Sequence, residues 1–162
     1  MVRECAATLA LLLTTPACSL LLDFSDPPPT APYTQTECNY HEPNDSRGAA
    51  APITPADAGP AAICPGATED HDFYQFSVPP GTARVEFKLD YVDRSGGDLD
   101  LRLYDGTATP PVSNSFGDEE RITCPGASPR CEALAAGDYV FEVFPASGAV
   151  NRYTFSLVLT PM

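Results

Sequence analysis

Apolar and polar side chains alternate with a period of two in four short segments of the chain. The segments are Tyr74–Val78, Val85–Tyr91, Leu99–Leu103 and Tyr153–Leu159. A period of two places successive side chains on opposite faces of an extended strand, so each segment has one apolar and one polar face. Strands of this kind are typical of antiparallel sheets that bury one face and expose the other.

The segment Tyr139–Phe144 is different, because it is apolar on both faces apart from Glu142. We expect it to form a central strand that is covered on both sides. Turn-forming residues separate the expected strands: Pro79-Pro80-Gly81, Ser95-Gly96-Gly97, Asp105-Gly106, Ala136-Gly137-Asp138 and Ser147-Gly148. No segment after Leu22 shows a helical stripe. The pattern predicts an all-β fold, an antiparallel β-sandwich of seven to eight strands.

The first 22 residues have the features of an export signal. A charged start at Met1–Glu4 precedes the apolar run Cys5–Leu13, and the small residue Ala17 precedes a candidate cleavage site. A membrane-spanning helix is the alternative, but it needs about twenty apolar residues. Here Pro16 and several hydroxyl residues interrupt the run, which ends at Asp23. We therefore expect residues 1–17 to be a signal peptide.

The sequence Thr15-Pro16-Ala17-Cys18 resembles the bacterial lipobox, whose cysteine becomes the lipid-modified first residue of the mature protein. Thr15, Pro16 and the acidic Glu4 depart from that pattern, and ordinary cleavage nearby, with Cys18 left as a thiol, is the alternative. The resemblance implies lipidation at Cys18 and a lipid membrane as partner. We expect a secreted protein held at the cell envelope, facing the periplasm or the outside.

Residues 18–36 contain Pro27-Pro28-Pro29 and Pro32, which favour an extended, semi-rigid tether. The folded domain is expected over residues 37–162. The net charge of the chain is −13, from 9 Lys+Arg and 22 Asp+Glu, so it has no basic surface for the phosphates of a nucleic acid. We therefore expect no nucleic-acid partner.

Six cysteines occur in the chain, and four of them lie in the expected domain. Cleavage would remove Cys5, and lipidation would use Cys18. The remaining four suggest two disulfides in an exported protein, with three possible pairings: Cys38, Cys64, Cys124 and Cys131. The short loop from Cys124 to Cys131 suits a local bridge, which leaves Cys38 for Cys64.

A zinc site is the alternative use of two of these cysteines. Cys38-x-x-His41 and Cys64-x6-His71 offer two thiolates and two imidazoles. The second spacing is loose, and an oxidising compartment favours the disulfide.

Four motifs occur in the order found in a known family: Glu42–Ser46, Asp70–Phe76, Gly97–Asp105 and Ala136–Val143. Together they resemble the bacterial pre-peptidase C-terminal domain, a module often appended to secreted proteases. The resemblance covers residues 37–160. It implies a jelly-roll-like sandwich, and relatives of this family in clostridial collagenases bind calcium and collagen.

The resemblance implies calcium ligands in the opening segment and in the acidic turn before a strand. Calcium prefers six to eight oxygen ligands, and these segments offer six side chains: Glu42, Asn44, Asp45, Glu69, Asp70 and Asp72. Tyr40 stands where relatives can carry a further acidic ligand. The alternative is structural, because Asn and Asp also form and cap turns.

Two further pairs of residues admit a functional interpretation. Asp98 and Asp100 share one face of a strand with Arg102, and we expect a solvated face rather than a metal site. Tyr139 and Tyr153 could contact a partner, as aromatic residues do in collagen-binding relatives. Both match core positions of the sandwich, so we expect them to be buried.

No sequence motif of a known catalytic centre occurs, and the only histidines are His41 and His71. We therefore expect no enzyme, but a non-catalytic envelope module that binds an extracellular polysaccharide or matrix protein. A purely structural envelope lipoprotein is one alternative. An accessory domain that acts in trans with a secreted protease is the other.

Overall fold

The computed structural model describes residues 33–66, 69–91, 97–106, 110–114 and 117–162. The expected signal peptide, Cys18 and the triple-proline segment lie outside the described residues. Within the described part, none of the helices has the length and apolar character needed to cross a membrane.

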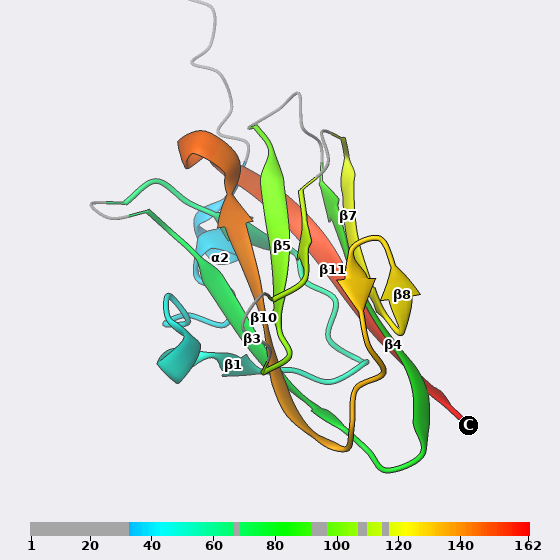
Figure 1. Cartoon of the computed structure of the whole chain (residues 1–162). Helices are drawn as coiled ribbons and strands as arrows, with labels where there is room; N and C mark the ends of the chain where they lie inside the picture. The colour runs from blue at the N-terminus through cyan, green and yellow to red at the C-terminus, as the bar shows by residue number, and fades with distance from the viewer. Residues whose placement is uncertain (1–32, 67–68, 92–96, 107–109, 115–116) are drawn as a thin grey trace, which may run out of the picture. The chain divides into compact units, whose positions relative to one another are not determined.

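Two sheets form the body of the domain (Figure 1). The five-stranded sheet has the order β1 (Ala51–Pro52), β3 (Asp72–Val78), β10 (Gly137–Pro145), β5 (Leu99–Tyr104) and β6 (Val112–Ser113). The four-stranded sheet has the order β2 (Ala61–Ile63), β11 (Asn151–Pro161), β4 (Thr82–Tyr91) and β7 (Glu119–Cys124). A small hairpin joins β8 (Gly126–Ala127) to β9 (Arg130–Cys131).

The chain alternates between the two sheets along most of its length, as in a jelly roll. It passes from β3 to β4, back to β5, and later from β10 to β11. Neighbouring strands pair antiparallel, except for the two-residue parallel pairing of β1 with β3. The antiparallel β-sandwich is confirmed, and seven of the described strands are three residues or longer.

The core lies between the sheets and consists of the apolar faces that the alternation predicts. Phe141 in β10 and Phe87 in β4 are fully buried, and their ring centroids lie 4.0 Å apart across the sheets. Phe76 stacks on Phe141 from the neighbouring strand, at 4.8 Å. Apolar burial of this extent is the main contribution to the stability of the domain.

Strand β10 occupies the centre of its sheet, between β3 and β5, as predicted for Tyr139–Phe144. One local prediction is wrong, because Gly137 and Asp138, predicted in a turn, already pair with Val78 and Ser77 in β10.

One short α-helix, α2 (Gln35–Cys38), lies in the described residues, and two 3₁₀ turns, η1 (Arg47–Ala49) and η2 (Ala146–Gly148), also occur. Helix α2 starts inside the segment predicted as tether. Its single turn is stabilised by a capping box, in which Thr34 and Glu37 accept from each other's backbone N–H groups. One turn is too short to produce the apolar stripe by which a helix is recognised in a sequence.

Both predicted disulfides are confirmed, Cys38–Cys64 and Cys124–Cys131. The first joins α2 to the residue that follows β2, across a sequence separation of 26. It uses both thiols that the zinc alternative requires.

Truncation of a core ring tests this packing. Phe141→Ala should lower the free energy of unfolding by about 3–5 kcal/mol, because it removes a fully buried ring and leaves a cavity. Val158→Ala is the control, since Val158 is 46% exposed, and it should change stability by less than about 0.5 kcal/mol. Denaturant unfolding measures both, and equal effects of the two substitutions would contradict the described core.

Candidate functional site

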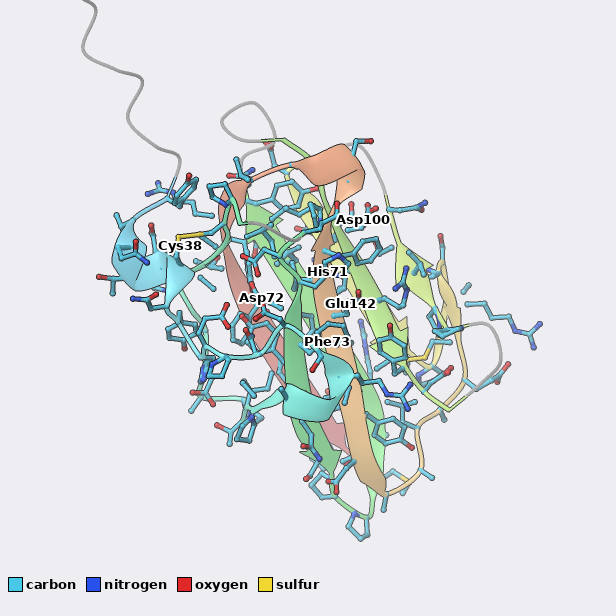
Figure 2. The ribbon with its side chains drawn as sticks, turned by 90° about the vertical axis from the view of Figure 1, so that its left-hand side faces the viewer. Cys38, His71, Asp72, Phe73, Asp100 and Glu142 are labelled. Atoms are coloured by element: carbon cyan, nitrogen blue, oxygen red, sulfur yellow. A yellow bond between two sulfur atoms is a disulfide. The ribbon has the colours of Figure 1, made fainter. Side chains whose placement is uncertain are left out.

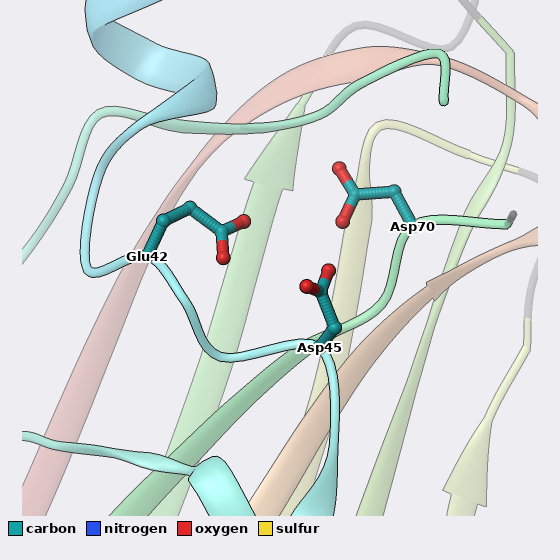
Figure 3. Close-up of side chains that lie close together, drawn as sticks. All are labelled: Glu42, Asp45 and Asp70. Atoms are coloured by element: carbon teal, nitrogen blue, oxygen red, sulfur yellow. The ribbon is translucent and has the colours of Figure 1, made fainter. Parts of the chain in front are cut away.

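Three carboxylates from two separate segments meet beside the start of β3. They belong to Glu42, Asp45 and Asp70, and one oxygen of each lies within 4.8 Å of the others. Figure 3 shows the three side chains pointing toward one another. We call this group the carboxylate cluster. Of the six side chains predicted to bind calcium, these three come together.

Backbone contacts fix the two segments against the sandwich. The Phe73 N–H donates to the Asn44 carbonyl at 3.0 Å, which attaches the opening segment to β3. The Cys64 N–H donates to Asp70 Oδ2 at 2.6 Å, and the Asn44 N–H donates to Glu42 Oε2 at 2.8 Å. The Cys38–Cys64 disulfide lies on the same side of the domain, so the position of the cluster is determined by covalent and hydrogen bonds.

The negative charges of the carboxylate cluster repel one another. Burial raises the pKa of Glu42, and the negative charges of Asp45 and Asp70 raise it further, against the lowering effect of the Asn44 N–H. The pKa of Asp70 is raised by burial first and then by contact with Asp45, although the Cys64 N–H lowers it. A cation placed between the three carboxylates would relieve this repulsion.

Asp72 points into the core instead of into the cluster. It is 2% exposed and accepts a hydrogen bond from the Tyr153 hydroxyl, which lies 2.6 Å from the Tyr74 hydroxyl. Burial raises the pKa of Asp72 well above its ordinary value, and the charges of Asp70 and Glu42 add to the shift. Asp72 is therefore close to the cluster in space without being one of its members.

The other two candidates, Asn44 and Glu69, are not among the three carboxylates of the cluster. Asn44 is fully buried, and neither polar atom of its side chain makes a well-oriented hydrogen bond within the described residues, although its amide is close enough to Asp72 to lower the pKa of that carboxyl. Glu69 is half exposed, and its carboxylate lies 3.6 Å from His71 Nε2. Tyr40 packs its ring on His41 and Phe155.

The donor set of the cluster fits a hard cation. It consists of carboxylate oxygens, which calcium prefers, and contains no thiolate. Asn44 lies in the same segment, between Glu42 and Asp45, and its buried amide carries a further oxygen. The residues present therefore suit calcium better than zinc.

A second polar group, which the sequence did not predict, lies on the outer face of the five-stranded sheet. Its centre is Glu142, a charged residue that is only 2% exposed. His71 Nδ1 lies 2.7 Å from Glu142 Oε1, and Arg102 and the Tyr104 hydroxyl donate to Oε2 at 2.6 and 2.8 Å. Figure 2 shows His71, Phe73 and Glu142 close together over β3 and β10.

Aromatic rings cover this face. The ring of His71 lies near those of Phe144 and Phe73, with centroids 6.1 and 6.4 Å away, and Phe73 is 6.2 Å from Tyr104. The guanidinium of Arg102 lies 4.4 Å from the centroid of Phe144. Side chains thus cover the outward face of β10, as predicted for a central strand. The covering side chains are aromatic and charged.

The remaining sequence candidates take structural positions. The Tyr91 hydroxyl donates to Asp98 at 2.6 Å, and neither Asp98 nor Asp100 joins a carboxylate cluster among the described residues. Tyr153 is buried in the core, as expected. Tyr139 packs on Phe76 but remains partly exposed.

The protonation of Asp100 gives a test of the outer-face electrostatics. Burial and the charges of Asp98 and Glu120 raise its pKa from 3.8 to about 6. The folded state then binds a proton more tightly than the unfolded state, so stability falls as pH rises from about 4 to about 6. Asp100→Asn should flatten this part of the profile of melting temperature against pH. Parallel profiles for the two proteins would contradict the assignment.

Comparisons with known proteins identify similarity only at the level of a solved structure. No family model matches the chain, and no curated protein matches it. The chain is similar to the crystal structure of the pre-peptidase C-terminal domain of a collagenase from Bacillus anthracis, with a TM-score of 0.46 and 11% sequence identity. The match covers 62% of this chain and 87% of that chain. This is the kind of domain that the sequence motifs resemble, but the likeness carries no argument about function, and the fold class rests on the strand pairing described above.

Proposed function

We propose that the protein is a non-catalytic, lipid-anchored module of the cell envelope, stabilised by calcium and able to bind an extracellular polymer or protein. The carboxylate cluster is the observation that carries the calcium part of this proposal. Three carboxylates, of which Glu42 and Asp70 have a raised pKa, are held together by the attachment of the opening segment to β3. A bound divalent cation would offset their negative charges and join the two segments.

The state of the reactive side chains supports a non-catalytic role. Cys38, Cys64, Cys124 and Cys131 are all in disulfides, so none of them is a nucleophile. His71 lies between Glu142 and Glu69, and no hydroxyl or thiol nucleophile contacts either of its ring nitrogens within the described residues. The geometry therefore favours a binding or structural role.

The anchoring part of the proposal rests on the sequence. The lipobox-like residues before Cys18 supply an attachment point, and the two disulfides suit an oxidising compartment. The two alternatives, a structural lipoprotein without a ligand and an accessory domain that serves a protease in trans, share this location. Binding experiments distinguish them from the proposed role.

Calcium should raise the melting temperature of the purified chain. At a free concentration about ten times the dissociation constant, the gain is about 1.4 kcal/mol, which corresponds to roughly 3–6 °C for a domain of this size. Extracellular modules bind calcium at about 0.1–1 mM, so the titration should extend to roughly 10 mM.

Two substitutions make this titration specific. Asp45→Asn removes a ligand of the exposed part of the cluster and should abolish the response. Glu69→Gln, in the same acidic turn as Asp70 but outside the cluster, should keep it. The absence of any calcium-dependent shift in the unmodified chain would refute the calcium part of the proposal.

Lipidation can be tested by substitution of the expected attachment residue. The unmodified chain should fractionate with membranes and partition into detergent, whereas Cys18→Ser should appear in the soluble fraction. Cys124→Ser provides a comparison, because it removes a cysteine of the domain and should leave the membrane association unchanged. Equal soluble fractions for the unmodified chain and Cys18→Ser would contradict the anchor.

A further inference from the structure

The outer faces of the two sheets both carry ion pairs but differ in their aromatic side chains and in shape. On the four-stranded sheet, three cations each pair with carboxylates of the same face: Arg84 with Glu86, Lys88 with Asp90 and Glu119, and Arg121 with Glu86 and Glu119. A face whose charges pair with each other leaves few groups for a ligand. The outer face of the five-stranded sheet instead carries partly exposed aromatic rings, and it is hollowed at one end.

The hollow lies where β5 ends and β10 begins, next to η1. Its volume is about 420 Å³, within the range of about 300–1,000 Å³ typical of small-ligand sites. Arg47, Tyr104 and Tyr139 contribute to its lining, together with Asp105 and Asp138. It therefore combines two phenol rings, two carboxylates and one guanidinium.

Both rings are fixed in place before any ligand binds. The Tyr104 hydroxyl donates to the buried Glu142, and its ring contacts Phe73. The Tyr139 ring packs on the core residue Phe76, with centroids 5.8 Å apart, and its hydroxyl donates to the Ala135 carbonyl at 3.0 Å. Rigid rings can bind a ligand with little loss of side-chain entropy.

The polar groups of the hollow can make further hydrogen bonds. The Arg47 guanidinium lies 4.9 Å from the centroid of Tyr104 and forms no ion pair with any described carboxylate. Asp138 accepts one hydrogen bond, from the Ser77 hydroxyl at 2.5 Å, and a carboxylate can accept several more. Donors and acceptors thus lie beside the aromatic surface.

We infer that this hollow binds a residue of a neutral polysaccharide, which gives the proposed binding function a site and a ligand class and rests on that function. Sugar hydroxyls can donate to Asp105 and Asp138 and accept from Arg47, and the C–H face of a sugar ring packs against the electron-rich face of a tyrosine. A polyanion would be repelled by the two carboxylates of the hollow and by the net charge of −13 on the chain. A polycation would be attracted by the two carboxylates, but it would bring positive charge beside the Arg47 guanidinium.

Two other hollows in the described residues fit this chemistry less well. The hollow beside α2 contains Glu37 and Arg152, which lie 4.0 Å apart and can neutralise each other. The hollow beside Cys64 contains Glu69 and Asp70 but no tyrosine. The hollow beside α2 also includes two tyrosines, but Tyr91 and Tyr153 are only 6% and 2% exposed, so their rings are part of the core. Among these three hollows, the one between Tyr104 and Tyr139 is therefore the one that presents two partly exposed tyrosine rings beside groups of both charges.

The test measures retention of the purified full chain on insoluble neutral glycans, including cellulose, chitin and a β-1,3-glucan. Anionic alginate and fibrous collagen serve as the other ligand classes. We expect retention on at least one neutral glycan, with elution by the matching soluble oligosaccharide. Arg47→Ala should weaken this binding about tenfold or more, since a hydrogen-bonding cation is lost. Because Arg47 is exposed, the fold should persist.

Matched substitutions separate the hollow from general effects. Arg130→Ala removes the same charge from an exposed site in the β8–β9 hairpin and should leave glycan binding unchanged. Asp138→Asn should weaken it. Equal binding by Arg47→Ala and Arg130→Ala would overturn the assignment of the hollow.

The ligand panel distinguishes failure of this inference from failure of the proposed binding function. Retention on collagen or alginate without retention on any neutral glycan would overturn the glycan inference and leave the binding function supported. Retention on none of the materials would overturn the glycan inference and favour the structural lipoprotein. Absence of the calcium response alone would leave both the glycan inference and the proposed binding function unaffected.

Discussion

The mutual repulsion of carboxylates at the start of β3 is the constraint on which this account depends. Glu42 and Asp45 belong to the opening segment, and Asp70 belongs to the loop before β3, so their repulsion opposes the docking of one segment on the other. The Phe73–Asn44 backbone hydrogen bond and the Cys38–Cys64 disulfide act against this repulsion. A bound calcium ion would also oppose the repulsion between the two segments. The clustered carboxylates would then hold the segments together as its ligands.

The entry into β3 connects three environments through three consecutive residues. Asp70 joins the carboxylate cluster, His71 reaches Glu142 on the outer face, and Asp72 turns inward to Tyr153. Strand alternation places Asp72 and Phe73, the first two residues of β3, on opposite faces, and His71 stacks with Phe73 on the outer face. The cluster, the core and the outer aromatic face therefore depend on the same register of β3, which pairs with β10 along its whole length.

The strands and disulfides that depend on local sequence pattern could be predicted from the sequence. Apolar alternation predicted β3, β4, β5 and β11, and cysteine spacing predicted both disulfides. Glu142 was visible only as a polar interruption in an apolar strand, because sheet pairing brings its partners to it from the residue before β3 and from β5. Asp72 was grouped with the ligands since composition does not reveal the face of a strand that a carboxylate occupies. The hollow beside Tyr104 and Tyr139 depends on the same long-range pairing, and no local signal marks it.

The sandwich thus has one ion-paired outer face, one aromatic outer face, and an acidic junction at the start of β3, on which the calcium claim rests. A crystal structure of the chain grown with millimolar calcium tests that claim most directly. The account predicts an ion about 2.3–2.6 Å from oxygens of Glu42, Asp45 and Asp70. The same three carboxylates gathered at this junction around water alone, under saturating calcium, would contradict it.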